Sequence, residues 1–435
     1  MQAVIMAGGA GTRLRELTRD EIPKPMALLA GKPLLEHQTD RLKEYGITDI
    51  TFVTGHLGHK IREYFGDGTA FGLNTSYIEE KEPLGTAGAM AFLRESVHET
   101  FFLIFGDIYF DFDMDRMAAF HREKGAEVTL LAHPNMHPYD SDLIRADHEG
   151  RVTGFDSKKN IRDYWYDNLV NAGIYVMEPE VLKRVPEPVK TDLEKEVIAG
   201  MIEAGEAVYA YSTPEFVRDV GTVDRILRTE EDIRSGVTKA RNLKNRQKAI
   251  FLDRDGTINV HKGFISRPED FELIPGAAEA IRHINESGYL AILVSNQPVV
   301  ARGECTEEEL GNIMNKMKTL IGREGAYLDA VYYCPHHPDS GFPGEVKELK
   351  IDCDCRKPKT GMTDRAAAEY NIDLSQSWVI GDTTSDMEMA RRAGCRKALL
   401  TGTGWKGTDG RYEVTTEIKA DDLKCAVAEI MNKEK

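Results

Sequence analysis

The stretch Ala249-Ile-Phe-Leu-Asp-Arg-Asp-Gly-Thr257 decides the fold of the C-terminal part of the chain. A short apolar run leads directly into two carboxylates, Asp253 and Asp255, two residues apart. At the end of a β-strand, such carboxylates can lie on one side, close to the same metal ion and phosphate. One can attack phosphorus while the other protonates the leaving oxygen and later activates water, provided that Mg²⁺ screens their repulsion.

Similar strand ends follow downstream. Ser295 and Asn296 come after the apolar run 290–294, Asp382 follows the run 378–380, and Lys357 lies in Cys355-Arg-Lys-Pro358. Upstream, short apolar runs at 3–6, 50–53, 100–105 and 208–211 alternate with helical patterns at 33–45 and 59–65. This alternation is typical of βαβ units. We therefore predict an α/β protein with two Rossmann-like domains whose sheets are mainly parallel.

The boundary between the domains is predicted from a change in composition. From Thr222 to about Arg246 the sequence is strongly charged and has no short apolar run, which favours a helix that ends in a linker, and a new strand starts at Lys248. A chain of 435 residues is also too long for one hydrophobic core. We predict domains at 1–232 and 248–435, joined by a linker at 233–247.

Charge and hydropathy exclude several classes of function. The formal charge of −16 makes nucleic acids and anionic membranes poor partners, and small phosphorylated metabolites suit the protein better. No apolar run has the roughly 18 residues of a membrane span, and no signal peptide precedes the glycines, so we expect a cytoplasmic protein. Six cysteines are too few for a disulfide framework and are expected to be thiols or metal ligands.

A second phosphate-binding pattern follows the first strand. The backbone N–H groups of the glycine-rich turn Gly8-Gly-Ala-Gly-Thr-Arg-Leu14 can cradle phosphate oxygens, and Arg13 adds a positive charge. Lys24 lies between Pro23 and Pro25, which restrict the backbone and could aim its ammonium group at the same phosphates. The combination is more specific than either motif alone.

Together these motifs resemble the signature of the sugar-1-phosphate nucleotidyltransferases over about residues 1–230. The resemblance implies Arg13 and Lys24 as catalytic residues that stabilise the leaving pyrophosphate, and Asp107 and Asp219 as Mg²⁺ ligands. It also implies nucleotide contacts at Gly8, Gly9, Gly11, Thr12, Gly85 and Thr86, and sugar-phosphate contacts at Lys158, Asn171 and Gly173.

The C-terminal motifs resemble the four-motif pattern of the haloacid dehalogenase superfamily. In this resemblance Asp253 is the nucleophile and Asp255 the general acid and base. Ser295 and Lys357 are phosphate ligands, and Asp253, Asp255 and Asp382 hold Mg²⁺. Asp386 is a further candidate for the metal site.

A cysteine cluster predicts a second metal. Cys334-Pro-His336-His337 is followed by Cys353-Asp-Cys355, which supplies three thiolates and an imidazole, the ligand set of a closed tetrahedral Zn²⁺ site. Such a zinc would be structural and would hold the loop that carries Arg356 and Lys357. Either histidine could bind, and the family pattern points to His336.

Phosphatases with such a zinc loop include the heptose 1,7-bisphosphate and the histidinol-phosphate phosphatases. Residues 248–405 look most like the heptose enzyme, although His261 replaces an expected acidic residue and Pro298-Val299-Val300 replaces smaller residues. This resemblance implies a wider set of phosphate and substrate contacts: His261, Lys262, Gly263, Phe264, Ser295, Asn296, Arg302, Arg356 and Lys357.

The two resemblances combine into one pathway. Removal of the 7-phosphate from a heptose 1,7-bisphosphate leaves a heptose 1-phosphate, which the N-terminal half would couple to GTP to give GDP-heptose. Two alternatives remain open: a hexose 1-phosphate transferase, for example for mannose 1-phosphate, fused to a histidinol-phosphate-type phosphatase, or an N-terminal sugar-nucleotide sensor without catalysis. The sequence leaves the oligomeric state open, a homo-oligomer included.

Overall fold

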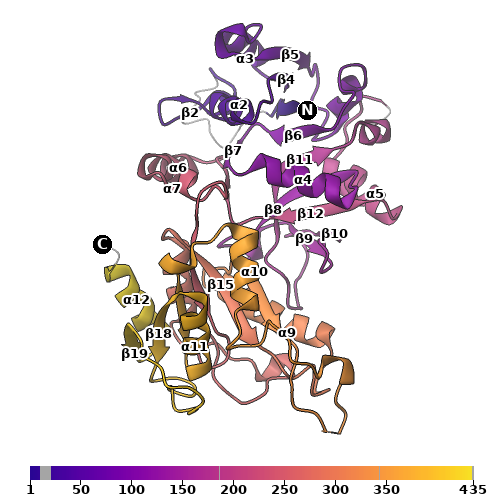
Figure 1. The fold of residues 1–435 in the computed structure, drawn as a ribbon. Helices are drawn as coiled ribbons and strands as arrows, with labels where there is room; N and C mark the ends of the chain where they lie inside the picture. The colour runs from indigo at the N-terminus through magenta and orange to yellow at the C-terminus, as the bar shows by residue number, and fades with distance from the viewer. Residues whose placement is uncertain (10–20, 186, 342, 434–435) are drawn as a thin grey trace. The chain divides into compact units, whose positions relative to one another are not determined.

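The computed structural model describes residues 1–9, 21–185, 187–341 and 343–433. The chain forms two compact units, each with its own sheet (Figure 1). Unit 1 comprises Met1–His133, Asp142–Ser157 and Leu169–Asn242, and unit 2 comprises Pro134–Ser141, Lys158–Asn168 and Leu243–Lys435. Both units combine helices with mainly parallel strands, so the predicted α/β class is confirmed.

The sheet of unit 1 has nine strands. Its central path runs in the order β10 (Val152–Asp156), β9 (Leu143–Ala146), β11 (Val170–Met177), β6 (Phe101–Phe105), β1 (Gln2–Ala7), β4 (Asp49–Thr54) and β5 (Asn74–Glu79). β8 (Val128–His133) pairs with β11 and with β12 (Val208–Ser212). β6, β1, β4 and β5 are mutually parallel, whereas β11 runs antiparallel to β6.

Helices cover both faces of this sheet because alternate residues of each buried strand point to opposite sides. On one face, Ala3 and Ile5 pack with residues of α2 (Leu34–Glu44), α3 (Gly58–Phe65) and α4 (Met114–Lys124). On the other face, Val4 packs with η4 (Gly88–Glu95), η6 (Pro179–Arg184), the π-helix η7 (Leu193–Ile198) and α5 (Ala199–Glu203).

Shorter elements complete unit 1. β7 (Ile108–Asp111) pairs antiparallel with β13 (Phe216–Asp219), and β2 (Leu28–Leu29) pairs with β3 (Lys32–Pro33). The charged stretch that starts at Thr222 forms α6 (Val223–Ser235) and α7 (Val237–Ala240), separated by Gly236 in the left-handed conformation. Thr222 caps α6 because its side-chain oxygen accepts from the amide of Arg225.

The sheet of unit 2 is parallel throughout. Its order is β16 (Ala330–Cys334), β15 (Tyr289–Asn296), β14 (Lys248–Leu252), β17 (Trp378–Gly381), β18 (Arg396–Leu400) and β19 (Ile418–Ala420). The chain starts in the middle at β14 and winds outward in both directions. The carboxyl ends of β14, β15 and β17 therefore meet at one edge, where ligands bind in open α/β sheets.

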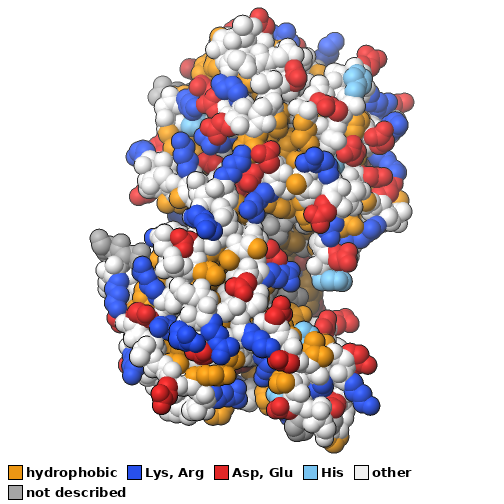
Figure 2. All heavy atoms as spheres, viewed as in Figure 1, with side chains coloured by type: hydrophobic (Ala, Val, Ile, Leu, Met, Phe, Trp, Pro, Cys, Tyr) orange, Lys and Arg blue, Asp and Glu red, His pale blue; other side chains and the backbone are white. Residues whose placement is uncertain are grey.

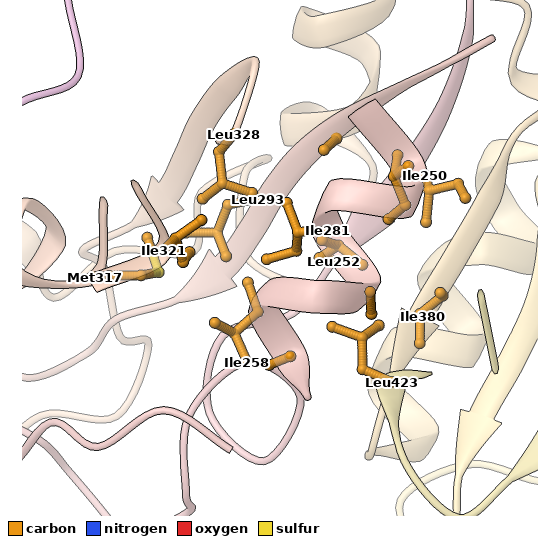
Figure 3. Close-up of a cluster of buried hydrophobic side chains, with 14 of the residues drawn as sticks. Ile250, Leu252, Ile258, Ile281, Leu293, Met317, Ile321, Leu328, Ile380 and Leu423 are labelled. Atoms are coloured by element: carbon orange, nitrogen blue, oxygen red, sulfur yellow. The ribbon is translucent and has the colours of Figure 1, made fainter. Parts of the chain in front are cut away.

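Two helix layers enclose this sheet. Ile250, Leu252 and Leu293 lie in one cluster with α8 (Ala277–Asn285), α9 (Glu307–Arg323) and α12 (Leu423–Lys433), and Figure 3 shows Leu252 and Leu293 beside Ile281 of α8. Phe251 and Ile292 face the other way, toward α10 (Gly361–Tyr370) and α11 (Thr384–Ala393). The sheet is thus buried on both faces, as its apolar strands require.

Two segments that lie early in the sequence belong to unit 2. The main chain of Tyr166 exchanges two hydrogen bonds of 3.1 Å with the hydroxyl of Thr319, which is fully buried in α9. Asp167 forms an ion pair of 2.6 Å with Lys318 of the same helix. Segment 158–168 therefore packs on α9 through hydrogen bonds of its main chain and an ion pair of a side chain.

The face drawn in Figure 2 carries charged side chains of both signs. Figure 2 shows acidic and basic side chains interspersed over the visible face of each unit, with hydrophobic side chains between them. Among the helices that the structure describes, none combines the length and the apolarity needed to cross a lipid bilayer.

Ile281→Ala should lower the free energy of unfolding of unit 2 by about 2–5 kcal/mol, because it leaves a cavity among fully buried side chains. Ile161→Ala is the matched control, since Ile161 of the same unit is 90% exposed. All three tryptophans lie in unit 2, so urea unfolding followed by tryptophan fluorescence reports on this unit. Equal effects of the two substitutions would contradict the assigned core.

Candidate active sites

Three carboxylates meet at the carboxyl edge of the sheet of unit 2. Asp253 directly follows β14, Asp382 directly follows β17, and Asp386 lies in the first turn of α11. β14 and β17 are parallel neighbours, so the residues that follow them come together. One oxygen from each of the three carboxylates lies within 4.8 Å of the others, and all three residues are buried.

Lys357 is the cation in this group. Its ammonium lies 2.7 Å from Asp253 and 2.6 Å from Asp386, and it donates to the carbonyl oxygen of Val294 at 3.0 Å. Burial by itself would lower the pKa of Lys357, but the Asp253 and Asp386 carboxylates raise it above its usual value. The lysine therefore stays charged.

Asn296 fixes Lys357 from the end of β15. The Asn296 side chain accepts from the amide of Lys357 at 2.9 Å and donates to its carbonyl oxygen at 3.2 Å. Ser295 donates to Asp253 at 3.0 Å. The structure thus brings together the predicted residues Asp253, Ser295, Asn296, Lys357 and Asp382, together with Asp386.

One lysine does not neutralise three carboxylates. Burial, followed by the charges of Asp253 and Asp386, raises the pKa of Asp382, and burial also raises the pKa of Asp253. The Oδ1 atom of Asp382 is buried and has no hydrogen-bond partner among the described residues. A divalent cation with oxygen ligands fits this group, because it would satisfy the orphaned oxygen and offset the repulsion.

Asp255 has a different environment. Its carboxylate receives hydrogen bonds from the fully buried Arg254 at 2.9 and 3.0 Å, from Asn259 at 3.0 Å and from Gln297 at 2.9 Å. Burial would raise the pKa of Asp255, but Arg254 and these hydrogen bonds hold it below its usual value. The Asp255 carboxylate is not part of the group of three, so its role as a metal ligand stays a prediction.

These three partners of Asp255 were not predicted from the sequence. Gln297 directly follows the predicted residues Ser295 and Asn296 and donates to both Asp255 and Ser295, each at 2.9 Å. Arg254 and Asn259 lie close to the aspartates in sequence. Their proximity was a usable signal, but the direction of each side chain depends on the fold.

The other predicted substrate contacts lie in two loops. His261 lies beside Trp405, with ring centroids 5.6 Å apart, and Lys262 pairs with Glu272 at 2.8 Å. After Gly263, which has a φ of +80°, the exposed Phe264 ring lies 4.5 Å from the guanidinium of Arg302.

The cysteine cluster of unit 2 assembles four ligand atoms. Cys334, His336, Cys353 and Cys355 each place one ligand atom within 4.8 Å of the others. His336 rather than His337 belongs to the group, because Nδ1 of His336 lies 3.3 Å from Sγ of Cys355 and 3.7 Å from Sγ of Cys334. Nδ1 of His337 instead accepts from the amide of Asp339. Hydrogen bonding with Cys334, followed by burial, raises the pKa of the Cys355 thiol. Arg356 donates to the carbonyl oxygen of His336 at 3.0 Å.

In unit 1, Gly8 and Gly9 follow β1, whereas Gly11, Thr12 and Arg13 lie outside the described residues. A side chain at Gly8 would collide with the Glu80 carboxylate, so the glycine allows a close approach. Lys24 forms an ion pair with Asp107, which follows β6. Gln38 of α2 donates to the carbonyl oxygens of Phe105 and Ile108 and so fixes the turn that carries Asp107.

Asp219 joins this region from the end of β13. The amide of Val220 donates to the carbonyl oxygen of Asp107 at 2.9 Å. Asp219 accepts from Gly221 at 2.6 Å and from Arg225 at 2.7 Å. A Cβ at Gly221 would lie 2.7 Å from the Asp219 carboxylate and 3.0 Å from the ammonium of Lys24. The structure thus brings Lys24, Asp107 and Asp219 together, and their partly exposed carboxylates are oxygen ligands suited to Mg²⁺.

The predicted nucleotide and sugar contacts of unit 1 are linked. Gly85, at φ +78°, pairs with Thr191, and the Thr86 hydroxyl accepts from the amide of Leu193 at 2.8 Å. The next residue, Glu194, accepts from Asn171 and from the buried Tyr175, each at 2.8 Å. Burial raises the pKa of Glu194.

Glu194 and Tyr175 were missed because neither stands in a recognisable motif. Gly173, at φ +72°, lies in the irregular part of β11 beside Asn171 and donates its amide to the Asn171 side chain. Lys158 was predicted to contact the same sugar phosphate. It belongs to unit 2, where its ammonium is 3.6 Å from Asp140.

Lys357→Met should lower the stability of metal-free protein by about 3–5 kcal/mol, because it leaves buried carboxylates without their cation. Lys424→Met removes the surface pair with Glu279 and should change stability little. Urea unfolding in buffer with a chelator measures both. Similar losses in the two variants would show that Lys357 does not stabilise the carboxylate group.

Comparisons with known proteins give a family for each part of the chain. Residues 2–236 match the family model described as nucleotidyl transferase, and residues 354–426 match the model described as HAD-hydrolase-like. The D-glycero-beta-D-manno-heptose-1,7-bisphosphate 7-phosphatase of Haemophilus ducreyi is 40% identical over 159 residues, which are 36% of this chain and 85% of the relative. The Yersinia pestis protein of that name is 42% identical over 156 residues, 36% of this chain and 81% of its own.

Among solved structures, HddC from Yersinia pseudotuberculosis aligns with a TM-score of 0.47 and 23% identity, over 53% of this chain and 99% of its own. The family matches confirm the prediction of a nucleotidyltransferase part followed by a phosphatase part. The chain therefore belongs to the nucleotidyl transferase family through residues 2–236 and, through its C-terminal part, to the family of the heptose-1,7-bisphosphate 7-phosphatases.

Proposed function

We propose that this chain is a bifunctional enzyme of the cytoplasm that acts twice on one sugar. The C-terminal domain, residues 248–435, removes the 7-phosphate from D-glycero-D-manno-heptose 1,7-bisphosphate. The N-terminal domain, residues 1–232, transfers GMP from GTP to the resulting heptose 1-phosphate, which gives GDP-heptose and pyrophosphate. The observation that carries the proposal is the buried group of Asp253, Lys357, Asp382 and Asp386. It lies in the C-terminal part of a chain that is 40% identical, over 159 residues, to a heptose-bisphosphate phosphatase.

The phosphatase step uses Asp253 as nucleophile. A carboxylate oxygen of Asp253 attacks the phosphorus of the 7-phosphate, the bond from phosphorus to O7 breaks, and Asp255 gives a proton to O7. Water then attacks the aspartyl-phosphate, gives its proton to Asp255, and releases inorganic phosphate. Arg254 and the neighbouring hydrogen bonds hold the pKa of Asp255 below its usual value, so Asp255 takes up a proton from solvent before it gives one to O7. After that step Asp255 is ionised, which suits it to accept the proton of the attacking water.

The surrounding residues hold the phosphoryl group. Lys357 and Ser295 already contact Asp253. Lys357 would neutralise phosphate oxygens at the same place, and Ser295 would orient them by hydrogen bonding. Asp253, Asp382 and Asp386 would hold Mg²⁺, which supplies further neutralisation of the developing charge.

The transferase step joins two phosphates. An oxygen of the sugar 1-phosphate attacks the α-phosphorus of GTP and expels pyrophosphate, so the protein must offset growing negative charge. Lys24 and Arg13 would stabilise the pyrophosphate, and Asp107 and Asp219 would hold Mg²⁺. Gly85 and Thr86 would contact the nucleotide, and Asn171 and Gly173 the sugar phosphate.

The anomer is part of the proposal. The relatives are 7-phosphatases of the beta-anomeric bisphosphate by name. The guanylyltransferase step that the sequence resemblance implies uses the alpha-anomeric 1-phosphate. We therefore propose that this phosphatase accepts the alpha anomer, and assays with both anomers test this choice.

Two substitutions should separate the two steps. With Mg²⁺, GTP and the alpha-anomeric bisphosphate, Asp253→Asn should abolish phosphate release, at least ~10³-fold, because the nucleophile is lost. Asp107→Asn should leave phosphate release intact and abolish formation of GDP-heptose, followed by mass spectrometry. Asp253→Asn protein supplied with heptose 1-phosphate should still form GDP-heptose. Phosphate release without nucleotide-sugar in the wild type would refute the transferase assignment and redirect it to a hexose phosphate or another nucleotide.

We also propose that Cys334, His336, Cys353 and Cys355 bind a structural Zn²⁺. The purified protein should contain about one zinc per chain by mass spectrometry, as expected for a closed site with four ligands. Cys353→Ser should lose this zinc and reduce phosphatase activity, because Lys357 follows Cys355 by two residues. Cys425→Ser, at an exposed cysteine outside the cluster, should keep both. A zinc-free wild type with full activity would contradict the proposal.

A further inference from the structure

The loop after β18 touches the carboxylate group of unit 2. The amide of Trp405 donates to Oδ2 of Asp382 at 2.6 Å, and the amide of Gly407 donates to the carbonyl oxygen of Asp382 at 2.8 Å. Both contacts are made by the main chain. The loop therefore has a fixed position relative to the proposed metal site, whatever side chain stands at position 405.

Two glycines make this approach possible. Gly256, at φ +81°, and Gly404, at φ +57°, face each other, and a Cβ on either would collide with the Asp382 carboxylate and the other glycine. Larger residues would push the loop away from the sheet edge. Glycines at positions 256 and 404 therefore allow the loop to bring Trp405 close to the proposed catalytic carboxylates.

The indole of Trp405 is available to a ligand. It is 48% exposed, an unusual degree for the largest apolar side chain, and its partner is the ring of His261. The centroids of the two rings are 5.6 Å apart and their planes are tilted by 55°. The rings form a bent surface rather than a stack.

His261 lies close in sequence to a residue that contacts Asp255, the proposed general acid and base. It follows Asn259 by two residues, and the Asn259 amide donates to Asp255. The Nδ1 atom of His261 is buried and has no hydrogen-bond partner among the described residues. One ring thus comes from the loop at Asp382 and the other from the loop at Asp255, and one of them carries an unused polar atom.

We propose that Trp405 and His261 form the platform that selects a sugar ring as the body of the phosphatase substrate. This inference rests on the proposed phosphatase function. A sugar offers an apolar C–H face, which packs on an indole, and hydroxyl groups, which suit an imidazole nitrogen. The 7-phosphate lies at Asp253, and the platform holds the rest of the molecule.

Steady-state kinetics can test the platform. Trp405→Ala should raise KM for the sugar bisphosphate by up to about tenfold and change kcat much less, because it removes ring contacts while the main-chain bond to Asp382 remains. Trp405→Phe should restore most of the loss. Each variant is also assayed with acetyl phosphate, which has neither a sugar ring nor sugar hydroxyl groups. The readout is kcat/KM for the sugar bisphosphate divided by kcat/KM for acetyl phosphate, and Trp405→Ala should lower this ratio. His261→Ala should lower the same ratio.

Fluorescence gives a second measurement. In an Asp253→Asn background, the heptose bisphosphate should change the tryptophan emission, and the change should vanish with Trp405→Phe. Trp165→Phe is the matched control and should keep the change, because the Trp165 ring packs against Lys316 and Arg323 of α9 and is not part of the proposed platform.

The outcomes separate the platform from the proposed substrate. An unchanged ratio of kcat/KM values in Trp405→Ala, with the fluorescence change retained in Trp405→Phe, would overturn the platform. If the wild type cleaves acetyl phosphate and a hexose phosphate but not the heptose bisphosphate, the heptose bisphosphate is not the substrate and that proposal is wrong. In that case a loss of the hexose phosphate preference in Trp405→Ala supports the platform, and an unchanged preference overturns it.

Discussion

The ion pairs of the buried Lys357 with Asp253 and Asp386 join three parts of unit 2 that are distant in sequence. Placing these charges out of water is costly unless each is paired. The surrounding structure meets this requirement: Asn296 clamps the main chain of Lys357, Ser295 donates to Asp253, and the amide of Trp405 donates to Asp382. The remaining excess of negative charge is what a divalent metal would offset.

The need to pair these buried charges also explains why two loops with little secondary structure have fixed positions beside the carboxylates. The cysteine cluster lies just before Lys357, and Arg356 bonds back to His336. A metal there would fix the loop at the point where the lysine must enter the site. The glycines at 256 and 404 act similarly on the opposite loop, because only bare backbone fits against Asp382.

In unit 1 the carboxylates of the proposed site are also paired with cations, but they are less buried. Lys24 pairs with Asp107, and Asp219 pairs with Arg225, so each carboxylate meets a cation while remaining partly exposed. The pairs at Thr191, Leu193 and Glu194 connect the segment at Gly85 with Asn171. A nucleotide and a sugar phosphate bound there would be held by one connected part of the fold.

The sequence by itself determined the α/β class, the strand ends that carry Asp253, Ser295, Asp107 and Asp382, and the cysteine cluster, because apolar runs followed by polar residues are local patterns. Only the tertiary structure decided that Asp386 joins Asp253 and Asp382 in the carboxylate group and that Asp255 contacts Arg254 and Gln297. It also decided that His336 rather than His337 lies beside the thiols and that Glu194 accepts a hydrogen bond from Asn171. It also placed Lys158 with unit 2 and Trp405 beside His261. These results depend on side-chain directions and on contacts between segments far apart in the chain, which no local pattern encodes.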